Sequence, residues 1–167
     1  MRFAVGDMVV YGSHGAGPVA ARTSKDVLGA RQEVIVLELA SGLRVELPLE
    51  RAHELLRPLA DESEIARVQE VLGADQAANG DTWLKRQRSS LAKLSNGSPT
   101  GLAEIIRDSA RREGTLSAKG SKSQLSPSER DLLTKARHLL STEIALVRGI
   151  ETEEADTWID RQLGRVR

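Results

Sequence analysis

The sequence predicts an α+β protein, in which a small N-terminal antiparallel β domain is followed by a helical domain of about five helices. Short runs rich in Val and Leu, with a period of two, fill residues 1–57. From Pro58 onward the apolar residues recur with a helical period. Only 2% of the 167 residues are aromatic, so Val, Leu, Ile and Ala must fill the core. We therefore predict a β domain over residues 1–57 and a helical domain over residues 58–167.

The β domain is predicted from five short apolar runs that are separated by glycine or polar residues. These runs are Phe3–Val5, Met8–Tyr11, Pro18–Arg22, Glu33–Leu39 and Leu43–Leu47. Hairpin turns are expected at Leu28-Gly29-Ala30 and at Ser41-Gly42. The last run alternates strictly between apolar and polar residues, which is typical of a half-buried strand. Five short strands in so few residues favour a small barrel or a strongly bent sheet.

Five helices are predicted beyond Pro58 from capping residues and apolar stripes. The residues expected to begin them are Asp61 or Ser63, Asp81 or Thr82, Ser98, Ser126 and Thr152. Gly73 and Gly114 are expected to end the first and the third helix. The Ser- and Lys-rich segment Thr115–Leu125 is expected to be a flexible loop. On the last helix, Trp158 is expected to belong to the core.

The composition argues against several classes of function. The chain has no cysteine, which excludes disulfides, thiolate metal sites and cysteine nucleophiles. His14, His53 and His138 are too far apart in sequence for a zinc motif. The Gly-rich segment 12–17 leads into a strand rather than a helix, so it is interpreted as a turn and not as a phosphate-binding loop. We therefore predict no catalytic residues, no metal and no cofactor; the protein is not expected to be an enzyme.

The charge of the chain is zero in total but unevenly distributed. Residues 61–81 hold six acids against one arginine. Residues 82–93 hold no acid, and their basic residues are Lys85, Arg86, Arg88 and Lys93. A local basic patch is therefore expected on the second helix. The apolar runs are far shorter than the ~20 residues of a membrane span, and the N-terminus is unlike a secretory signal, so we expect a cytoplasmic protein without a membrane partner.

Trp83 stands at the predicted start of the helix that carries the basic patch. The core-facing stripe of this helix is predicted to be Leu84, Gln87, Leu91 and Leu94, which would leave Trp83 beside the cations. A large flat apolar side chain among cations suits either wedging between bases or anchoring a protein interface. A half-buried tryptophan that bridges to the next helix is an equally good interpretation of the residues alone.

Several segments, in chain order, resemble the CarD/CdnL family of bacterial transcription regulators. They are Phe3-x-Val5-Gly6-Asp7-x-Val9-Val10-Tyr11 with His14-Gly15, the strand Leu43–Pro48, Thr82-Trp83 with its basic run, Leu91-Ala92-Lys93-Leu94, Ile106-Arg107-Asp108 and Lys135–Leu140. The N-terminal block is also similar to the polymerase-interacting domain of transcription-repair coupling factor. The helical half, with its tryptophan and basic run, favours the CarD/CdnL type.

The resemblance implies a Tudor-like β domain that binds the β subunit of RNA polymerase. The polymerase-binding residues would be Lys25, Arg44, Val45, Glu46 and Pro48. The helical domain would contact promoter DNA without reading its sequence, and Trp83 would wedge into the minor groove at the upstream edge of the transcription bubble. Phosphates would be held by Lys85, Arg86, Arg88 and Lys93.

Such a protein, a monomer tethered to polymerase in the nucleoid, would stabilise the open promoter complex. The alternative is a polymerase-binding adaptor whose helical domain recruits another protein rather than DNA.

Two features depart from the family pattern. Glu46 stands where the relatives carry a basic residue, so it is expected either to weaken polymerase binding or to match an altered partner. In the first case, Glu46→Arg would strengthen polymerase binding. The segment Thr115–Leu125 is also longer than in the relatives.

Overall fold

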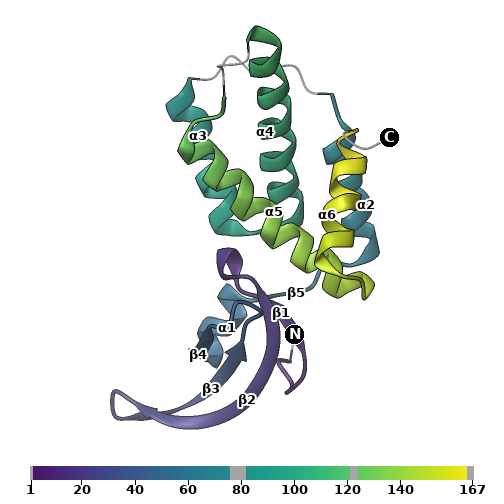
Figure 1. Cartoon of the computed structure of the whole chain (residues 1–167). Coiled ribbons are helices and arrows are strands. Elements are labelled where there is room, and N and C mark those ends of the chain that lie inside the picture. Colours follow the sequence, from purple (N-terminus) through teal and green to yellow (C-terminus); the bar gives the residue numbers. More distant parts are fainter. Residues whose placement is uncertain (1, 76–81, 121–123, 165–167) are drawn as a thin grey trace. The chain divides into compact units, whose positions relative to one another are not determined.

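The chain folds into two compact units, Met1–Leu59 and Ala60–Arg167, in a computed structural model that describes residues 2–75, 82–120 and 124–164 (Figure 1). The first unit holds a five-stranded antiparallel sheet in the order β4-β3-β2-β1-β5. The described residues of the second unit form five helices. The predicted α+β class and the order of its parts are confirmed. The first unit ends two residues after the predicted boundary, because Arg57 and Pro58 pair with β1.

The sheet of the first unit has two long strands and three short ones. They are β1 (Met8–Val10), β2 (Ala16–Val27), β3 (Ala30–Glu38), β4 (Arg44–Pro48) and β5 (Arg57–Pro58). A bulge between Val19 and Ala21 divides β2 into a part that pairs with β1 and a part that pairs with β3. Beyond the residues that pair with β1 and β4, strands β2 and β3 continue as a two-stranded hairpin.

The hairpin closes on the predicted two-residue turn, Leu28-Gly29. Both residues have positive φ, 52° at Leu28 and 83° at Gly29, as a type I′ turn requires. Glycine adopts this conformation without penalty, whereas a left-handed leucine costs about 1–2 kcal/mol. The turn is therefore strained at its first position.

Two predictions for the first unit are wrong. The segment Phe3–Val5 is not a strand, because the Asp7 carboxylate accepts a hydrogen bond from the Ala4 amide (2.9 Å) and folds this segment into a turn. A seven-residue helix, α1 (Leu49–Leu55), was not expected after β4. It buries Ala52 in the core of this unit.

The core of the first unit lies on one face of the sheet. Its buried residues are Phe3, Val9, Val19, Ile35, Leu37, Leu39, Leu47, Ala52 and Leu56. Of the segment 12–17, predicted as a turn, residues 12–14 form a single 3-10 turn, whereas Ala16 and Gly17 already belong to β2. Gly17 lets the backbone at Glu38 approach closely, since a Cβ at position 17 would lie 2.2 Å from the Glu38 carbonyl oxygen.

The five helices of the second unit begin where the capping residues predict. They are α2 (Glu62–Gly73), α3 (Trp83–Asn96), α4 (Pro99–Lys119), α5 (Pro127–Arg148) and α6 (Thr152–Gln162). The first four have the N-caps Asp61, Thr82, Ser98 and Ser126, whose side chains each accept a hydrogen bond from a first-turn amide. The other candidate cap, Asp81, lies outside the described residues.

Helix α4 is longer than predicted. It passes through Gly114 and ends at Lys119, so the first five residues of the predicted loop Thr115–Leu125 are helical. Gly114 does not have the positive φ that makes a glycine a helix terminator, in contrast to Gly97 and Gly149. Residues 121–123 of that loop lie outside the described residues.

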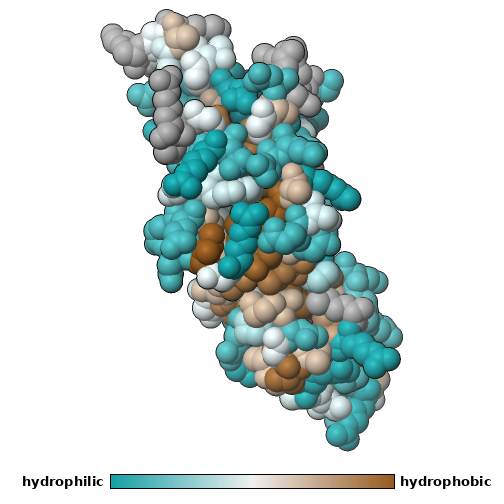
Figure 2. All heavy atoms as spheres, turned by 90° about the vertical axis from the view of Figure 1, so that its right-hand side faces the viewer, coloured by the Kyte–Doolittle hydropathy of each residue, from teal (hydrophilic) through white to brown (hydrophobic). Residues whose placement is uncertain are grey.

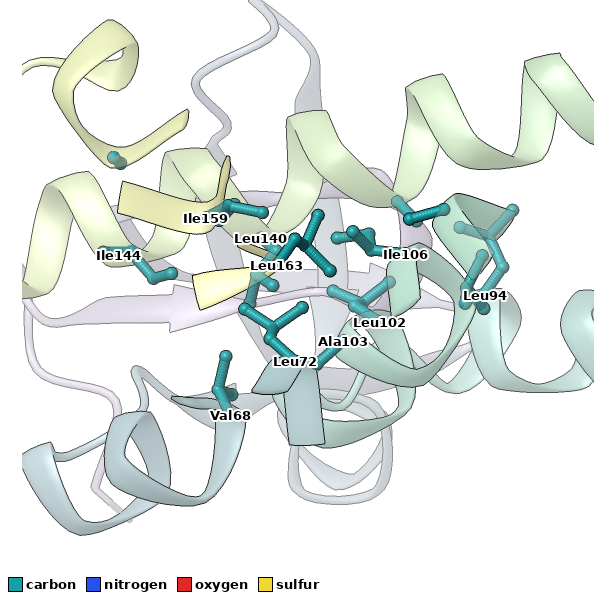
Figure 3. Close-up of a cluster of buried hydrophobic side chains, with 14 of the residues drawn as sticks. Val68, Leu72, Leu94, Leu102, Ala103, Ile106, Leu140, Ile144, Ile159 and Leu163 are labelled. Carbon is teal, nitrogen blue, oxygen red and sulfur yellow. The ribbon is translucent and has the colours of Figure 1, made fainter. Parts of the chain in front are cut away.

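All five helices contribute to the core of the second unit, and Figure 3 shows their side chains pointing toward one another. The labelled residues are Val68, Leu72, Leu94, Leu102, Ala103, Ile106, Leu140, Ile144, Ile159 and Leu163. Trp158 is only partly buried and packs against this core, with the Arg148 guanidinium 4.9 Å from its ring centroid. Its prediction as a core residue is right in part.

Ion pairs join the helices around this core. They are Lys93–Glu104 between α3 and α4, Arg112–Glu129 between α4 and α5, Arg137 with Asp156 and Asp160 between α5 and α6, and Arg148–Glu62 between α5 and α2. The face in Figure 2, which includes α2 and α6, carries mostly hydrophilic side chains on the helical unit. Within the described ranges, no helix is long and apolar enough to cross a membrane.

Candidate functional site

Four of the five residues predicted to bind polymerase lie on one face of the sheet. Strand register places Arg44, Glu46 and Pro48 of β4 on the face that carries Val34 and Val36 of β3. The same alternation places Lys25 of β2 on this face, because it pairs with Gln32. Val45 points to the opposite face and packs against the core. The structure therefore separates Val45 from the other four residues.

An ion pair crosses this face from β2 to β4. The Lys25 ammonium donates to the Glu46 carboxylate at 2.6 Å, and the register places Val34 between the two residues. Val34 and Val36 are buried although they point away from the core. The Lys25–Glu46 contact spans the middle strand on the face to which Val34 and Val36 point. We name Lys25, Glu46, Val34 and Val36 the paired face.

The paired face is electrostatically self-compensated. The hydrogen bond from Lys25 lowers the pKa of the Glu46 carboxyl, and the charges of Lys25 and Arg44 lower it further. Arg44 in turn forms an ion pair with Glu38 at 3.4 Å on the same face. Each cation of this surface thus has a carboxylate beside it. Glu46 is held as an anion by residues of its own chain.

Strand β4 is also an edge of the sheet. It pairs with β3 on one side, and no described strand pairs with its other side. An edge strand offers backbone donors and acceptors to a strand of another protein. Pro48 has no N–H, so the edge available for such pairing is limited to residues 44–47.

The predicted DNA-binding residues all lie on α3. Trp83 is the first residue of this helix, and Thr82 caps it by accepting a hydrogen bond from the Lys85 amide (3.3 Å). The helix ends at Gly97, which has a left-handed φ of 69°. Leu94 is its one buried residue. The Trp83 side chain is 45% exposed.

The predicted core stripe of α3 is right for Gln87 and Leu94 and wrong for Leu84 and Leu91. Leu84 and Leu91 are about half exposed, at 52% and 49%. The stripe that faces the core is instead Trp83, Gln87, Ser90 and Leu94, in which burial increases from the first residue to the last. Ser90 is polar and was not assigned to the stripe, whereas the two exposed leucines were assigned to it because they are apolar. Trp83 thus occupies the outer end of the packed side of the helix.

The four basic residues of α3 divide into two pairs. Lys85 and Arg88, three residues apart, are exposed, whereas Arg86 and Lys93, seven apart, are partly buried. The Lys93 ammonium contacts the Glu104 carboxylate on α4 at 2.8 Å. Lys93 is also ten residues from Trp83, which is about 15 Å along a helix. The structure therefore leaves Arg86 beside Trp83, places Lys85 and Arg88 on the opposite, exposed side of the helix, and holds Lys93 in a helix–helix contact.

Sequence reasoning missed three exposed apolar residues at these surfaces. Leu84 and Leu91 flank Arg88 on the outer side of α3, and Leu28 stands at the hairpin tip. A leucine where a type I′ turn favours asparagine was a detectable signal for Leu28. Among the described residues, no three His, Asp or Glu side chains gather where they could hold a metal ion.

The comparisons with known proteins cover both units. Residues 3–60 match the CarD-like/TRCF RID domain, and residues 67–160 match the CarD C-terminal domain. A Bacillus subtilis (strain 168) protein named "Putative transcription factor YdeB" is 25% identical over 154 residues, which cover 91% of this chain and 96% of that protein.

Proposed function

Because the chain belongs to the CarD family of transcription-associated regulators, we propose that it binds the β subunit of RNA polymerase and stabilises the open promoter complex. Its family implies an interaction with RNA polymerase and no enzymatic activity. The β unit would supply the polymerase contact and α3 the DNA contact. It would act as a monomer on promoter DNA in the cytoplasm, at the nucleoid.

The polymerase contact is supported by the paired face and the neighbouring edge of β4. A strand of the β subunit would add to residues 44–47 by backbone hydrogen bonds. Arg44, Glu46 and Lys25 would then face side chains of the partner. Because Glu46 is already paired with Lys25, its negative charge would not repel the partner as strongly as an isolated carboxylate would.

A charge-swapped variant tests this contact without removing the ion pair. Lys25→Glu combined with Glu46→Lys keeps a cation and a carboxylate across Val34, so the fold should remain. We expect the swap to weaken binding of the full chain to cognate RNA polymerase by about tenfold, since a reversed charge pattern opposes the partner's. Unchanged affinity of the folded variant would place the polymerase contact elsewhere.

The DNA contact is supported by Trp83 with Arg86 beside it, and by Lys85 and Arg88 on the exposed side of the same helix. A half-exposed ring at a helix start can enter a distorted base step, while flexible cations hold phosphates without reading bases. We infer that this surface engages the minor groove at the upstream edge of the bubble. The carrying observation is the 45% exposure of Trp83 on a helix that buries only Leu94.

Salt dependence distinguishes DNA binding from the runner-up function. The exposed Leu84 and Leu91 on the same helix favour a second candidate, in which α3 recruits a protein to polymerase. On forked promoter DNA with polymerase, Arg88→Ala should reduce the salt slope of binding by roughly one, equally for different promoter sequences. The control is Arg130→Ala on the exposed side of α5. A slope that Arg88→Ala leaves unchanged supports the adaptor function instead.

A further inference from the structure

Leu28, at the tip of the β2–β3 hairpin, is an apolar residue with no contact that rewards its conformation. Its relative exposure is 102%, and its φ is 52°, in the left-handed region. The next residue, Gly29, is the glycine that a type I′ turn requires, whereas the first position favours asparagine, aspartate or glycine. The isolated chain therefore bears both strain and an unburied leucine. An outlier of this kind indicates a contact that the isolated chain lacks.

The hairpin tip continues the paired face. Lys25 pairs with Gln32 in the strand register, and the next row on the same face is Val27 opposite Ala30. Leu28 follows directly. A single surface thus runs from Glu46 over Val34 and Lys25 to the apolar tip. A partner seated on the paired face would lie next to the strand row that leads to Leu28.

The chemistry around the tip favours a protein partner over a nucleic acid. Two cations and two anions lie near it, and Asp26 stands opposite Arg31 across the hairpin. The four are Lys25, Asp26, Arg31 and Glu33. A neutral surface attracts no phosphate backbone, and no aromatic ring at the tip could stack on a base. An exposed leucine gains free energy only by entering an apolar surface.

We propose that Leu28 inserts into an apolar depression on the polymerase surface that receives the paired face, and that it adds affinity there. This inference rests on the proposed function. The strained leucine is then a specificity residue, whose conformational cost is recovered in the complex. Replacing Leu28 with a residue that suits the turn should therefore raise the stability of the free chain and lower its affinity for polymerase.

The test compares Leu28→Asn and Leu28→Met with the unmodified full chain. Asparagine suits the turn, so Leu28→Asn should raise the Tm by about 2–5 °C and weaken binding to cognate core polymerase by about fivefold or more. Leu28→Met keeps an apolar side chain and should retain most of the affinity. Val5→Asn, which replaces another exposed apolar residue of this unit, should leave affinity unchanged.

Each other outcome overturns a definite part of this account. If the unmodified chain fails to bind polymerase, the proposed function fails together with the inference. If the unmodified chain binds and Leu28→Asn binds equally well, only the inference fails. If Leu28→Asn converts a dimer into a monomer in sedimentation and leaves polymerase affinity unchanged, the occupant of the tip is a second copy of this chain.

Discussion

Helix α3 buries one of its fourteen residues, whereas α5, in the same unit, buries seven of its twenty-two. Both helices start at a capped N-terminus and end at a left-handed glycine, so local chain chemistry does not distinguish them. The distinction lies in where their apolar residues point. On α5 most of them face the core, whereas on α3 Leu84 and Leu91 lie outside the packed side and Trp83, at its outer end, is half exposed. A helix that is held by so little burial has most of its surface available to a partner.

The two tryptophans repeat this contrast. Trp158 packs against the core and lies under the Arg148 guanidinium, which also pairs with Glu62. Trp83 packs only at the edge of the core and is half exposed. The two rings therefore differ in environment, since the core and Arg148 hold Trp158, whereas Trp83 is open to solvent.

The largest expected effect comes from removing a core residue of α5. Ile144→Ala should lower the free energy of unfolding by about 2–5 kcal/mol, because it leaves a cavity among the packed helices. Leu91→Ala on α3 should change it by no more than about 0.5 kcal/mol. Urea unfolding of the full chain measures both. Similar losses in the two variants would mean that Leu91 is packed and that the contrast between the helices is false.

Replacing the two tryptophans should have effects of intermediate size on the free energy of unfolding. Trp158→Ala removes a partly buried ring and a cation–π contact, so we expect a loss of about 2 kcal/mol. Trp83→Ala should cost less than about 1 kcal/mol. Thermal unfolding of the two variants ranks them directly. The reverse ranking would assign Trp83 to the core of the unit.

A smaller effect is expected at the start of α3. Thr82→Ala removes the side chain that accepts the Lys85 amide, which should cost about 1 kcal/mol. The loss should be local, with faster amide hydrogen exchange in the first turn of α3 and none in α5. Thr82→Ser is the control, because serine retains the cap. Uniformly faster exchange across both helices would contradict an independently held α3.

The smallest expected effect is on the pH dependence of stability, at the Arg112–Glu129 ion pair between α4 and α5. Burial raises the pKa of the Glu129 carboxyl, but the Arg112 guanidinium and the Ser126 hydroxyl outweigh it and hold the pKa below its ordinary 4.5. A depressed pKa in the folded state contributes stability above pH 4.5, and this contribution is lost as the pH falls through the lower, folded value. Glu129→Gln should therefore flatten the decline of unfolding free energy below about pH 4.5. An unchanged decline would show that other carboxyls cause it.

Much of the fold was predictable because its signals are local. The caps Asp61, Ser98 and Ser126 and the Leu28-Gly29 turn each satisfy or direct nearby backbone groups, and such chemistry can be recognised in a few residues. The missed elements depend on distant contacts. Helix α1 has about two turns and is too short to be stable without the packing of Ala52 in the core of its unit. Helix α4 continues through Gly114, where the backbone stays helical.

The candidate site was predictable in its residues but not in its arrangement. The basic run and Trp83 were visible in the sequence. The packed side of α3 was placed only in part, because it includes the polar Ser90 and leaves out the apolar Leu84 and Leu91. The ion pair joins Lys25 of β2 with Glu46 of β4, which are 21 residues apart in sequence and have β3 between them in the sheet. A period-two pattern gives the face of each strand but not which long side chains meet across it.

The lifetime of the open promoter complex tests the central claim most directly, that α3 carries its tryptophan for DNA and not for the fold. The lifetime is measured with cognate polymerase and either the unmodified chain or Trp83→Ala, alongside the Tm of each and its affinity for polymerase. We predict a shorter lifetime, with Tm and polymerase affinity nearly unchanged and partial retention in Trp83→Phe. A lifetime equal to that of the unmodified chain, or a Tm lowered by about ten degrees, would contradict the account.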